Sequence, residues 1–354
     1  MGNQSNIKAP SLIIEGLHLD LSEFGSWRQW SPEVQWQIDI KNTIENWYSS
    51  SSSMDVQTSG STGVPKQIPL LKERMTQSAR ATAKHFGLQE KCKALLCLPC
   101  QFIAGKMMVI RSIVNHWELT AIEPSLNLSG NTQNMDFIAM TPHQMSHMLI
   151  GQDEIGNSKT TVILGGAAVS AVLQDQIKHL KARVHETYGM TETITHVATK
   201  ALNGTNSSTH FTCLPGIQYT LSPDNRLGFS GGHLKENIET NDLAEPVDMK
   251  SFLLKGRIDH VINSGGIKIH PGELEKTLEK WLDVNYYISS MNHEELGEQV
   301  VLVMERAPLD EVAENLLLST MKSYLAPHHC PKKIIYETSF SRTGSGKIKR
   351  KKFS

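Results

Sequence analysis

No apolar run in this sequence reaches the length of a membrane-spanning helix. Such a helix needs about 20 consecutive, predominantly apolar residues, and polar side chains interrupt every hydrophobic segment of this chain before that length. The first ten residues, MGNQSNIKAP, also lack the basic and then apolar pattern of a secretory signal. We therefore expect no membrane span.

Cysteine is scarce, and neither sign of charge is in excess. The five cysteines are an odd number, at Cys92, Cys97, Cys100, Cys213 and Cys330. This set suits a reducing compartment better than a disulfide framework, and it favours the cytoplasm. With 35 basic against 36 acidic residues, the chain gives no general case for a nucleic-acid or membrane-surface partner.

One cysteine pair fits a metal-ligand spacing. Cys97 and Cys100 form a C-x-x-C pair that follows an apolar run, and His328, His329 and Cys330 could complete a metal set. The simpler interpretation is two thiols at the end of a strand. No second C-x-x-C pair supports the metal set, so we favour the simpler interpretation.

Strands alternate with helices through the middle of the chain. We expect helices over 71–86, 106–114, 142–149 and 170–181, and strands over 93–98, 136–141, 160–164 and from 184 to 187. Thr141 is the expected cap of the helix that Pro142 opens. This alternation predicts a parallel sheet with helices on both faces, whose ligands bind beyond the carboxyl ends of the strands.

The segment before residue 58 is rich in tryptophan. It holds four of the six tryptophans, namely Trp27, Trp30, Trp36 and Trp47. The pattern predicts a helix over 32–48, with Ser31 as its cap. We expect the indoles to pack this helix on the protein body, because nucleic-acid stacking needs a basic surround that is missing here.

The sequence pattern changes after about residue 210, from alternating strands and helices to short strand-like runs. Short strand-like runs separated by Pro, Asp, Asn and Gly predict a small β subdomain over 210–256. A glycine turn at 264–266, helices over 271–282 and 309–325, and strands over 300–304 and 333–336 then predict a compact α+β region. A chain of 354 residues is long enough for about two domains.

The stretch TSGSTGVPK, residues 58–66, combines glycines, hydroxyl side chains and a terminal lysine. Consecutive backbone N–H groups in such a loop can form an anion nest, and hydroxyls and a lysine can bind phosphate oxygens. The alternative is a Ser/Gly surface loop. The usual P-loop pattern fails, because Lys66 neither follows a glycine directly nor precedes Ser or Thr.

This loop resembles the phosphate loop of the adenylate-forming superfamily of acyl-CoA synthetases, luciferases and adenylation domains. Three further matches follow in the family's order: HETYGMTE (185–192), LKGRIDHVINSGGIKIHPGELE (254–275) and SRTGSGKIKR (341–350). The resemblance implies a large α/β N-terminal domain over 1–257, with mostly parallel sheets and a small β subdomain. A small, mobile α+β C-terminal domain over 258–354 would follow. The region before the phosphate loop is much shorter than in the family.

The resemblance also implies roles for individual residues. The phosphates of ATP would be held by Thr58, Ser59, Gly60, Ser61, Thr62, Gly63 and Lys66, although Gln67 stands where the family usually has Gly. Adenine would lie on Gly165, Gly166 and Ala167 and stack on Tyr188, next to Gly189; the alternative for the two glycines is a tight strand-to-helix turn. Thr191 would contact the α-phosphate and Glu192 would ligate Mg²⁺, a hard cation that prefers oxygen ligands.

Later motifs imply the ribose site and the moving parts. Asp242 and Arg257 would bind the ribose, and Asn241 replaces the family's usual Gly at little cost, because Asn tolerates a left-handed backbone. Asp259 would be the hinge of a domain rotation. Once the domain has rotated, Gly265 and Gly266 would line the CoA channel. Lys347 would be the catalytic lysine of adenylation; the alternative is one more lysine in a basic tail.

The implied enzyme is an acid–thiol ligase that uses ATP, Mg²⁺ and CoA, in which a carboxylate forms an acyl-adenylate and a thiol then releases AMP. The chain looks most like the short bacterial o-succinylbenzoate–CoA ligases, whose second carboxylate needs a polar partner; Lys106 or His196 is expected to supply it. Lys106 could instead be a lysine at a helix start that faces water. Other aryl- or short-chain acid ligases, a carrier-loading adenylation enzyme and an inactive nucleotide-binding protein remain open, as does a homo-oligomer.

Overall fold

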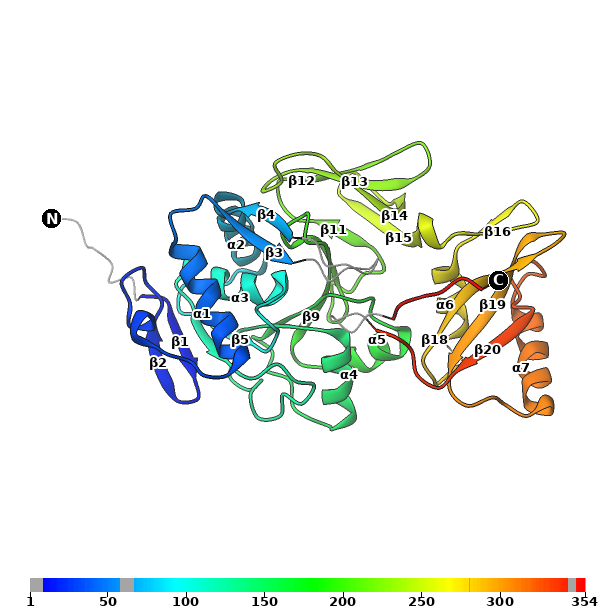
Figure 1. Ribbon diagram of the computed structural model, residues 1–354, viewed down its shortest axis with the longest axis horizontal. Coiled ribbons are helices and arrows are strands. Elements are labelled where there is room, and N and C mark those ends of the chain that lie inside the picture. Colours follow the sequence, from blue (N-terminus) through cyan, green and yellow to red (C-terminus); the bar gives the residue numbers. More distant parts are fainter. Residues whose placement is uncertain (1–8, 58–66, 280, 343–347, 354) are drawn as a thin grey trace. The chain divides into compact units, whose positions relative to one another are not determined.

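The computed structural model describes residues 9–57, 67–279, 281–342 and 348–353 (Figure 1). It divides into two compact units. Unit 1 comprises Met1–Val169, Leu173–Thr220 and Phe229–Ile238, and unit 2 comprises Ser170–Val172, Leu221–Gly228 and Glu239–Ser354. The predicted domain boundary between residues 257 and 258 stays a prediction.

A parallel sheet forms the centre of unit 1. Its neighbouring strands, in spatial order, are β1 (Ser11–Ile14), β6 (Glu118–Ala121), β5 (Lys93–Leu96), β7 (Phe137–Met140), β8 (Thr161–Leu164) and β9 (Arg183–Gly189). Antiparallel strands flank it, with β2 (Leu17–Asp20) on β1, and β10 (His196–Ala201) and β11 (Phe211–Cys213) beyond β9. The predicted parallel sheet is confirmed.

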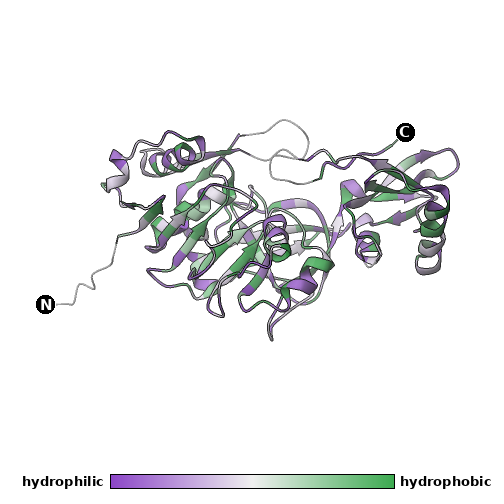
Figure 2. Ribbon diagram, turned by 90° about the horizontal axis from the view of Figure 1, so that it is seen from below, coloured by the Kyte–Doolittle hydropathy of each residue, from purple (hydrophilic) through white to green (hydrophobic). Residues whose placement is uncertain are grey.

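Helices cover both faces of this sheet, as expected. Side chains alternate along a strand, so Leu96 packs in one core and its neighbour Leu95 in the other. The first core includes side chains of α1 (Gln35–Tyr48), α2 (Lys72–Phe86) and α3 (Ile103–Asn115), and the second includes those of α4 (Pro142–Ile150) and α5 (Ala171–Ile177). In Figure 2 much of the sheet is hydrophobic, as strands buried on both faces require.

The ends of the helices agree with the sequence prediction in some places and differ from it in others. At α4, the predicted cap Thr141 accepts a hydrogen bond from the N–H of Gln144, and the Gln144 side chain accepts one from the Thr141 N–H. The predicted cap Ser31 is wrong, because α1 begins at Gln35 after Val34 without a side-chain cap. Helix α5 stops at Ile177, where hydrogen bonds from residue i to i−3 replace the helical pattern.

The expected packing of the tryptophans is confirmed. Trp27 is buried in the first core, and Trp30, Trp36 and Trp47 pack against it. All five cysteines are free thiols and buried. Cys97 and Cys100 of the C-x-x-C pair are among these buried thiols, and the described residues contain no group of three or more His, Cys, Asp and Glu that could hold a metal ion.

The remaining strands and helices form the predicted β subdomain and the predicted C-terminal α+β region. The β subdomain consists of β12 (Ile217–Leu221), β13 (Arg226–Gly231), β14 (Ile238–Pro246) and β15 (Ser251–Arg257). The C-terminal region contains β16 (Ile262–Ser264), β17 (Ile267–Ile269), α6 (Pro271–Leu278), β18 (Tyr286–His293), β19 (Gly297–Glu305), α7 (Glu311–Tyr324) and β20 (Lys333–Glu337). Its sheet packs on α6 and α7 through one apolar core. No helix within the described ranges is long and apolar enough to cross a membrane.

Candidate functional site

Two groups of predicted site residues lie outside the described residues. These are the phosphate-loop residues Thr58, Ser59, Gly60, Ser61, Thr62, Gly63 and Lys66, and the catalytic candidate Lys347. The flanks of the first group are described. Strand β3 (Ser53–Gln57) pairs antiparallel with β4 (Gln67–Leu71), and Gln57 lies directly opposite Gln67. A sequence-local hairpin therefore sets the two ends of the predicted phosphate loop.

The predicted adenine loop follows the carboxyl end of β8. Gly166 adopts a φ of +88°, which favours glycine, and a Cβ on Gly165 would come within 2.9 Å of the Thr187 hydroxyl. That hydroxyl donates to the carbonyl of Leu164 at 2.9 Å. Gly166 and Ala167 are exposed, so the backbone between them is open to a flat ligand. The tight turn and the nucleotide site are therefore compatible.

Tyr188 and Gly189 end β9 at the same edge of the sheet. The Tyr188 ring is mostly buried and packs on Phe211 and Phe229, with ring centroids 6.0 and 5.4 Å away. A Cβ on Gly189 would come within 2.2 Å of the Thr195 carbonyl oxygen, so only glycine fits beside β10. Both residues stay predicted nucleotide contacts.

Thr191 and Glu192 lie in the turn between β9 and β10. Glu192 is exposed, and Thr193 holds the turn by accepting from the N–H of Met190 at 2.9 Å and donating to the Thr195 carbonyl at 2.7 Å. Ile194 is buried with a φ of +67°, which is strained for a β-branched side chain. Strain of this kind concentrates at functional sites, which agrees with the role predicted for this turn.

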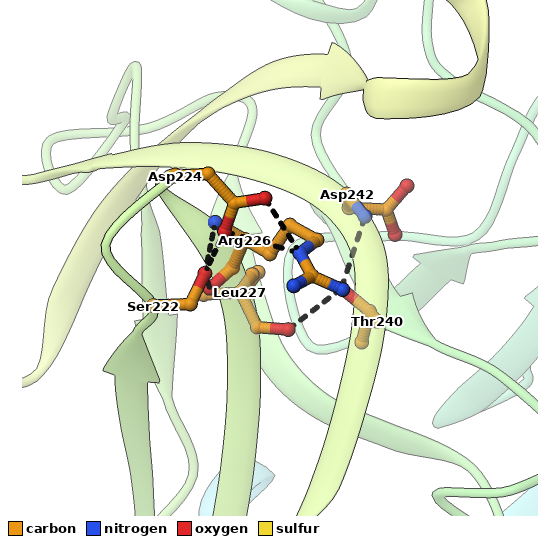
Figure 3. Close-up of polar contacts among 6 residues, drawn as sticks. All are labelled: Ser222, Asp224, Arg226, Leu227, Thr240 and Asp242. Atoms are coloured by element: carbon orange, nitrogen blue, oxygen red, sulfur yellow. Dashed lines mark hydrogen bonds and ion pairs between the residues drawn. The ribbon is translucent and has the colours of Figure 1, made fainter.

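In unit 2, Asp242 and Arg257 lie opposite each other on β14 and β15. The Thr240 hydroxyl donates to the Leu227 carbonyl at 2.7 Å and accepts from the Asp242 N–H at 3.1 Å. In Figure 3 the Asp242 carboxylate points away from the neighbouring pair of Asp224 and Arg226. Two hydroxyls of a ribose could bond such a carboxylate.

Arg257 also reaches the predicted hinge. Its Nη1 lies 3.7 Å from Asp242 Oδ1, and its Nη2 donates to Asp259 Oδ2 at 2.7 Å. Burial alone would raise the pKa of Asp259, but the hydrogen bond and charge of Arg257 outweigh it and lower the pKa. Arg257 therefore contacts both the predicted ribose carboxylate and the predicted hinge.

Gly265 and Gly266 make the turn between β16 and β17. Their φ angles are +59° and +83°, and Ser264 pairs with Ile267 across the turn. Two consecutive positive φ angles are typical of a tight hairpin turn and favour glycine. The structure thus accounts for the two glycines locally, and the CoA-channel role stays a prediction.

The two acid-pocket candidates have different surroundings. Lys106 lies in the first turn of α3 and is half-buried. Burial lowers the pKa of its ammonium group, and the nearby Cys100 and Asp39 partly offset this decrease. His196 on β10 is buried, with Nε2 3.4 Å from the Thr82 hydroxyl. Burial, with the charge of Arg111 adding to it, holds the pKa of His196 well below its usual value, so the ring is neutral.

Arg111 on α3 was missed by the sequence reasoning. It is 2% exposed, its Nε has no hydrogen-bond partner among the described residues, and its Nη1 points at Met108 Sδ at 3.7 Å. Burial lowers its pKa to about 10. Its charge also acts on His233, whose Nε2 lies 3.0 Å from the Thr193 carbonyl. The available signal was a single charge inside the apolar run MMVIRSIV.

This chain is similar to several known proteins. The family model described as AMP-binding enzyme matches residues 54–222. A solved acyl-CoA synthetase (AMP-forming)/AMP-acid ligase II-like protein from Dyadobacter fermentans is 33% identical, with a TM-score of 0.61, over 92% of this chain and 95% of that chain.

Two further relatives are more distant. A 2-succinylbenzoate–CoA ligase from Listeria monocytogenes is 26% identical over 87% of this chain and 71% of its own length. The o-succinylbenzoate coenzyme A synthetase of Bacillus subtilis, solved with ATP and magnesium, shares the fold with a TM-score of 0.70 at 20% identity, over 84% of this chain and 68% of that one. The chain therefore belongs to the AMP-binding enzyme family, as an AMP-forming acid–CoA ligase.

Proposed function

We propose that this ligase activates o-succinylbenzoate, an aromatic dicarboxylic acid, and joins it to CoA in menaquinone biosynthesis, in the cytoplasm. The relatives named 2-succinylbenzoate–CoA ligase support this substrate, at 22% to 26% identity for the Listeria and Staphylococcus proteins. The chain's own residues add a more specific argument.

The observation that carries the proposal is the buried charge of Arg111. An unpaired guanidinium in an apolar core is costly, and no acidic group among the described residues perturbs its pKa. Neutral His196 and His233 next to it leave the positive charge uncompensated. A second carboxylate on the substrate would supply the missing anion, which a monocarboxylic fatty acid cannot do.

Arg111 fits this task better than Lys106. Residues five apart on a helix point roughly 140° away from each other, so the two side chains of α3 do not share one face. Cys100 and Asp39 act electrostatically on the pKa of Lys106, whereas Arg111 acts on that of His196. We therefore assign the second carboxylate to Arg111 and His196, and retain Lys106 as the alternative.

The chemistry would run in two halves. One substrate carboxylate oxygen attacks the α-phosphorus of ATP and expels pyrophosphate; Lys66 and Thr191 would hold the phosphates, and Lys347 would contact the acyl and phosphate oxygens. The CoA sulfur then attacks the acyl carbon and expels AMP. Catalysis of this kind comes mainly from positioning and electrostatics.

Glu192 suits a magnesium site. It is an exposed carboxylate in a turn fixed by Thr193, and Mg²⁺ usually takes one or two protein carboxylates and completes its shell with phosphate oxygens and water. When bound, the ion would neutralise phosphate charge. Glu192 would hold the ion, and the turn between β9 and β10 would keep that carboxylate in a fixed position.

An AMP-release assay tests the substrate. Wild-type protein with ATP, Mg²⁺ and CoA would be offered o-succinylbenzoate, benzoate, acetate, a medium-chain fatty acid and several amino acids. We expect a strong preference for o-succinylbenzoate. Arg111→Met keeps the buried volume but removes the charge, and should raise the KM for o-succinylbenzoate about 10- to 100-fold, the worth of a hydrogen bond to a charged group. The KM for ATP and the turnover of benzoate should not change.

The alternatives give other outcomes. Another aryl- or short-chain acid ligase would prefer a different acid in the same panel. A carrier-loading enzyme would exchange pyrophosphate without forming a CoA thioester. An inactive nucleotide-binding protein would bind ATP and release no AMP with any acid.

A further inference from the structure

Glu186 lies within the HETYGMTE motif, but none of the roles above uses it. It is 6% exposed on β9, directly opposite Lys200 of the antiparallel strand β10. Lys200 Nζ lies 2.6 Å from Glu186 Oε2, in an ion pair rather than a well-aligned hydrogen bond. The same ammonium lies 5.0 Å from the centre of the Phe211 ring. The pair is thus enclosed inside unit 1.

The other carboxylate oxygen contacts a different part of the chain. Glu186 Oε1 accepts a hydrogen bond from the backbone N–H of Val169 at 3.2 Å. Val169 ends the loop that carries Gly165, Gly166 and Ala167. At the start of this loop, the next residue of β9, Thr187, donates to the Leu164 carbonyl at 2.9 Å. Consecutive residues of β9 therefore hold both ends of the loop, and the exposed backbone lies between them.

A contribution to stability alone explains this arrangement poorly. Removing a carboxylate and an ammonium from water costs free energy that their attraction barely repays, and well-packed apolar side chains often serve as well or better. What an apolar pair cannot do is accept a hydrogen bond from Val169. Lys200 supplies the opposite charge beside the Glu186 carboxylate, and hydrogen bonds to a charged acceptor are the stronger kind.

We propose that Glu186, supported by Lys200, is a positioning residue for the adenine of ATP. It fixes the position of the backbone of residues 165–169, on which the adenine lies. In this way it makes ATP preferred over nucleotides with other bases. This inference rests on the proposed function, because it takes Gly165, Gly166 and Ala167 as the adenine loop.

Two matched double variants test the proposal. E186Q/K200M and E186A/K200M both remove the two charges, so neither leaves a buried ion without its partner. They differ in one feature: Gln keeps an oxygen that can accept from the Val169 N–H, and Ala does not. The measurements are the Kd of ATP by calorimetry without acid or CoA, the KM values for ATP and acid, and the ratio of turnover with ATP to turnover with GTP.

We expect E186Q/K200M to remain within about 3-fold of wild type, and E186A/K200M to lose roughly 3- to 10-fold in ATP affinity, as for one lost hydrogen bond. Its preference for ATP over GTP should fall as well, with the KM for the acid unchanged. Equal ATP affinity of the two variants, or an equal loss for ATP and GTP, would overturn the proposal. A general folding defect would affect both nucleotides alike.

A measurement on the unmodified protein keeps the test decisive even if E186A/K200M does not fold. In amide hydrogen exchange, the Val169 N–H should be protected relative to that of Ala168; an unprotected Val169 would sink the proposal. The two levels also fail separately. A wild type that binds no ATP refutes the proposed function together with this inference, whereas normal ATP binding that is equal in both double variants refutes only the inference.

Discussion

Lys347 is the single side chain on which adenylation should depend most. Replacing it with alanine removes a positive charge that would stabilise the transition state. The loss of one such preorganised group typically costs about 10²- to 10³-fold in rate. We expect Lys347→Ala to lose adenylation to this extent, measured by pyrophosphate exchange, while calorimetry shows little change in ATP binding. An unchanged exchange rate would leave Lys347 as a lysine of the basic tail.

Lys106 and Arg111 offer a comparison between two cations of one helix. Lys106→Met should raise the KM for a dicarboxylate if Lys106 reaches the substrate, and we expect this effect to be smaller than that of Arg111→Met. The physical reason is burial, because Arg111 is 2% exposed whereas Lys106 is half-buried. A larger effect at Lys106 would place the second carboxylate at the start of α3.

Two glycines separate steric crowding from backbone strain. Gly189 has no room for a Cβ, since one would lie 2.2 Å from a backbone oxygen, whereas Gly166 has open space but a φ of +88°. Gly166→Ala should therefore cost only about 1–2 kcal/mol of stability, and Gly189→Ala should cost more, because β10 must move. Urea unfolding of both variants would check the order, and an equal cost would mean that β10 adjusts freely.

Strands and helices of unit 1 enclose several histidines. Burial is the main cause that lowers the pKa of His85, His185, His196 and His233, to about 4 for His185. The unfolded chain then binds more protons below pH 6.5, so the folded state is favoured above that pH and loses stability as the pH falls towards 4. Each histidine contributes a slope of at most about 1.4 kcal/mol per pH unit.

Urea unfolding between pH 7.5 and 5 would measure this loss. His185→Phe is a suitable control, because His185 Nδ1 has no hydrogen-bond partner among the described residues and its ring packs edge-on against Phe86. We expect this variant to show a shallower slope than wild type. A slope equal to that of wild type would mean that His185 has the same pKa in the folded and the unfolded state.

Elements with strong local signals were predictable from the sequence. The run FIAM of β7 and the Thr141–Gln144 capping box of α4 need little more than their own residues. The β1–β2 hairpin was missed, because its short strands carry a weak pattern and are stabilised by pairing with the distant β6. The sequence identified the site motifs, but it could not show that Arg111 and Glu186 are buried, since burial depends on contacts far along the chain.

At the scale of the whole molecule, the predicted rotation about Asp259 remains the main expectation. Proline at this position fixes φ and removes an N–H, so Asp259→Pro should hold the C-terminal region in one arrangement. We expect only one half-reaction to suffer, which single-turnover measurements of adenylate formation and of thioester formation would separate. Equal losses in both would contradict a hinge.

The β3–β4 hairpin has a consequence for protein engineering. Pairing of Gln57 with Gln67 already brings together the ends of the nine residues between them. The pairing of the two strands therefore meets the entropy cost of bringing these ends together. Such a segment should behave as an exchangeable cassette, into which nine-residue sequences from relatives could be grafted to change phosphate-analogue selectivity while the melting temperature stays nearly constant.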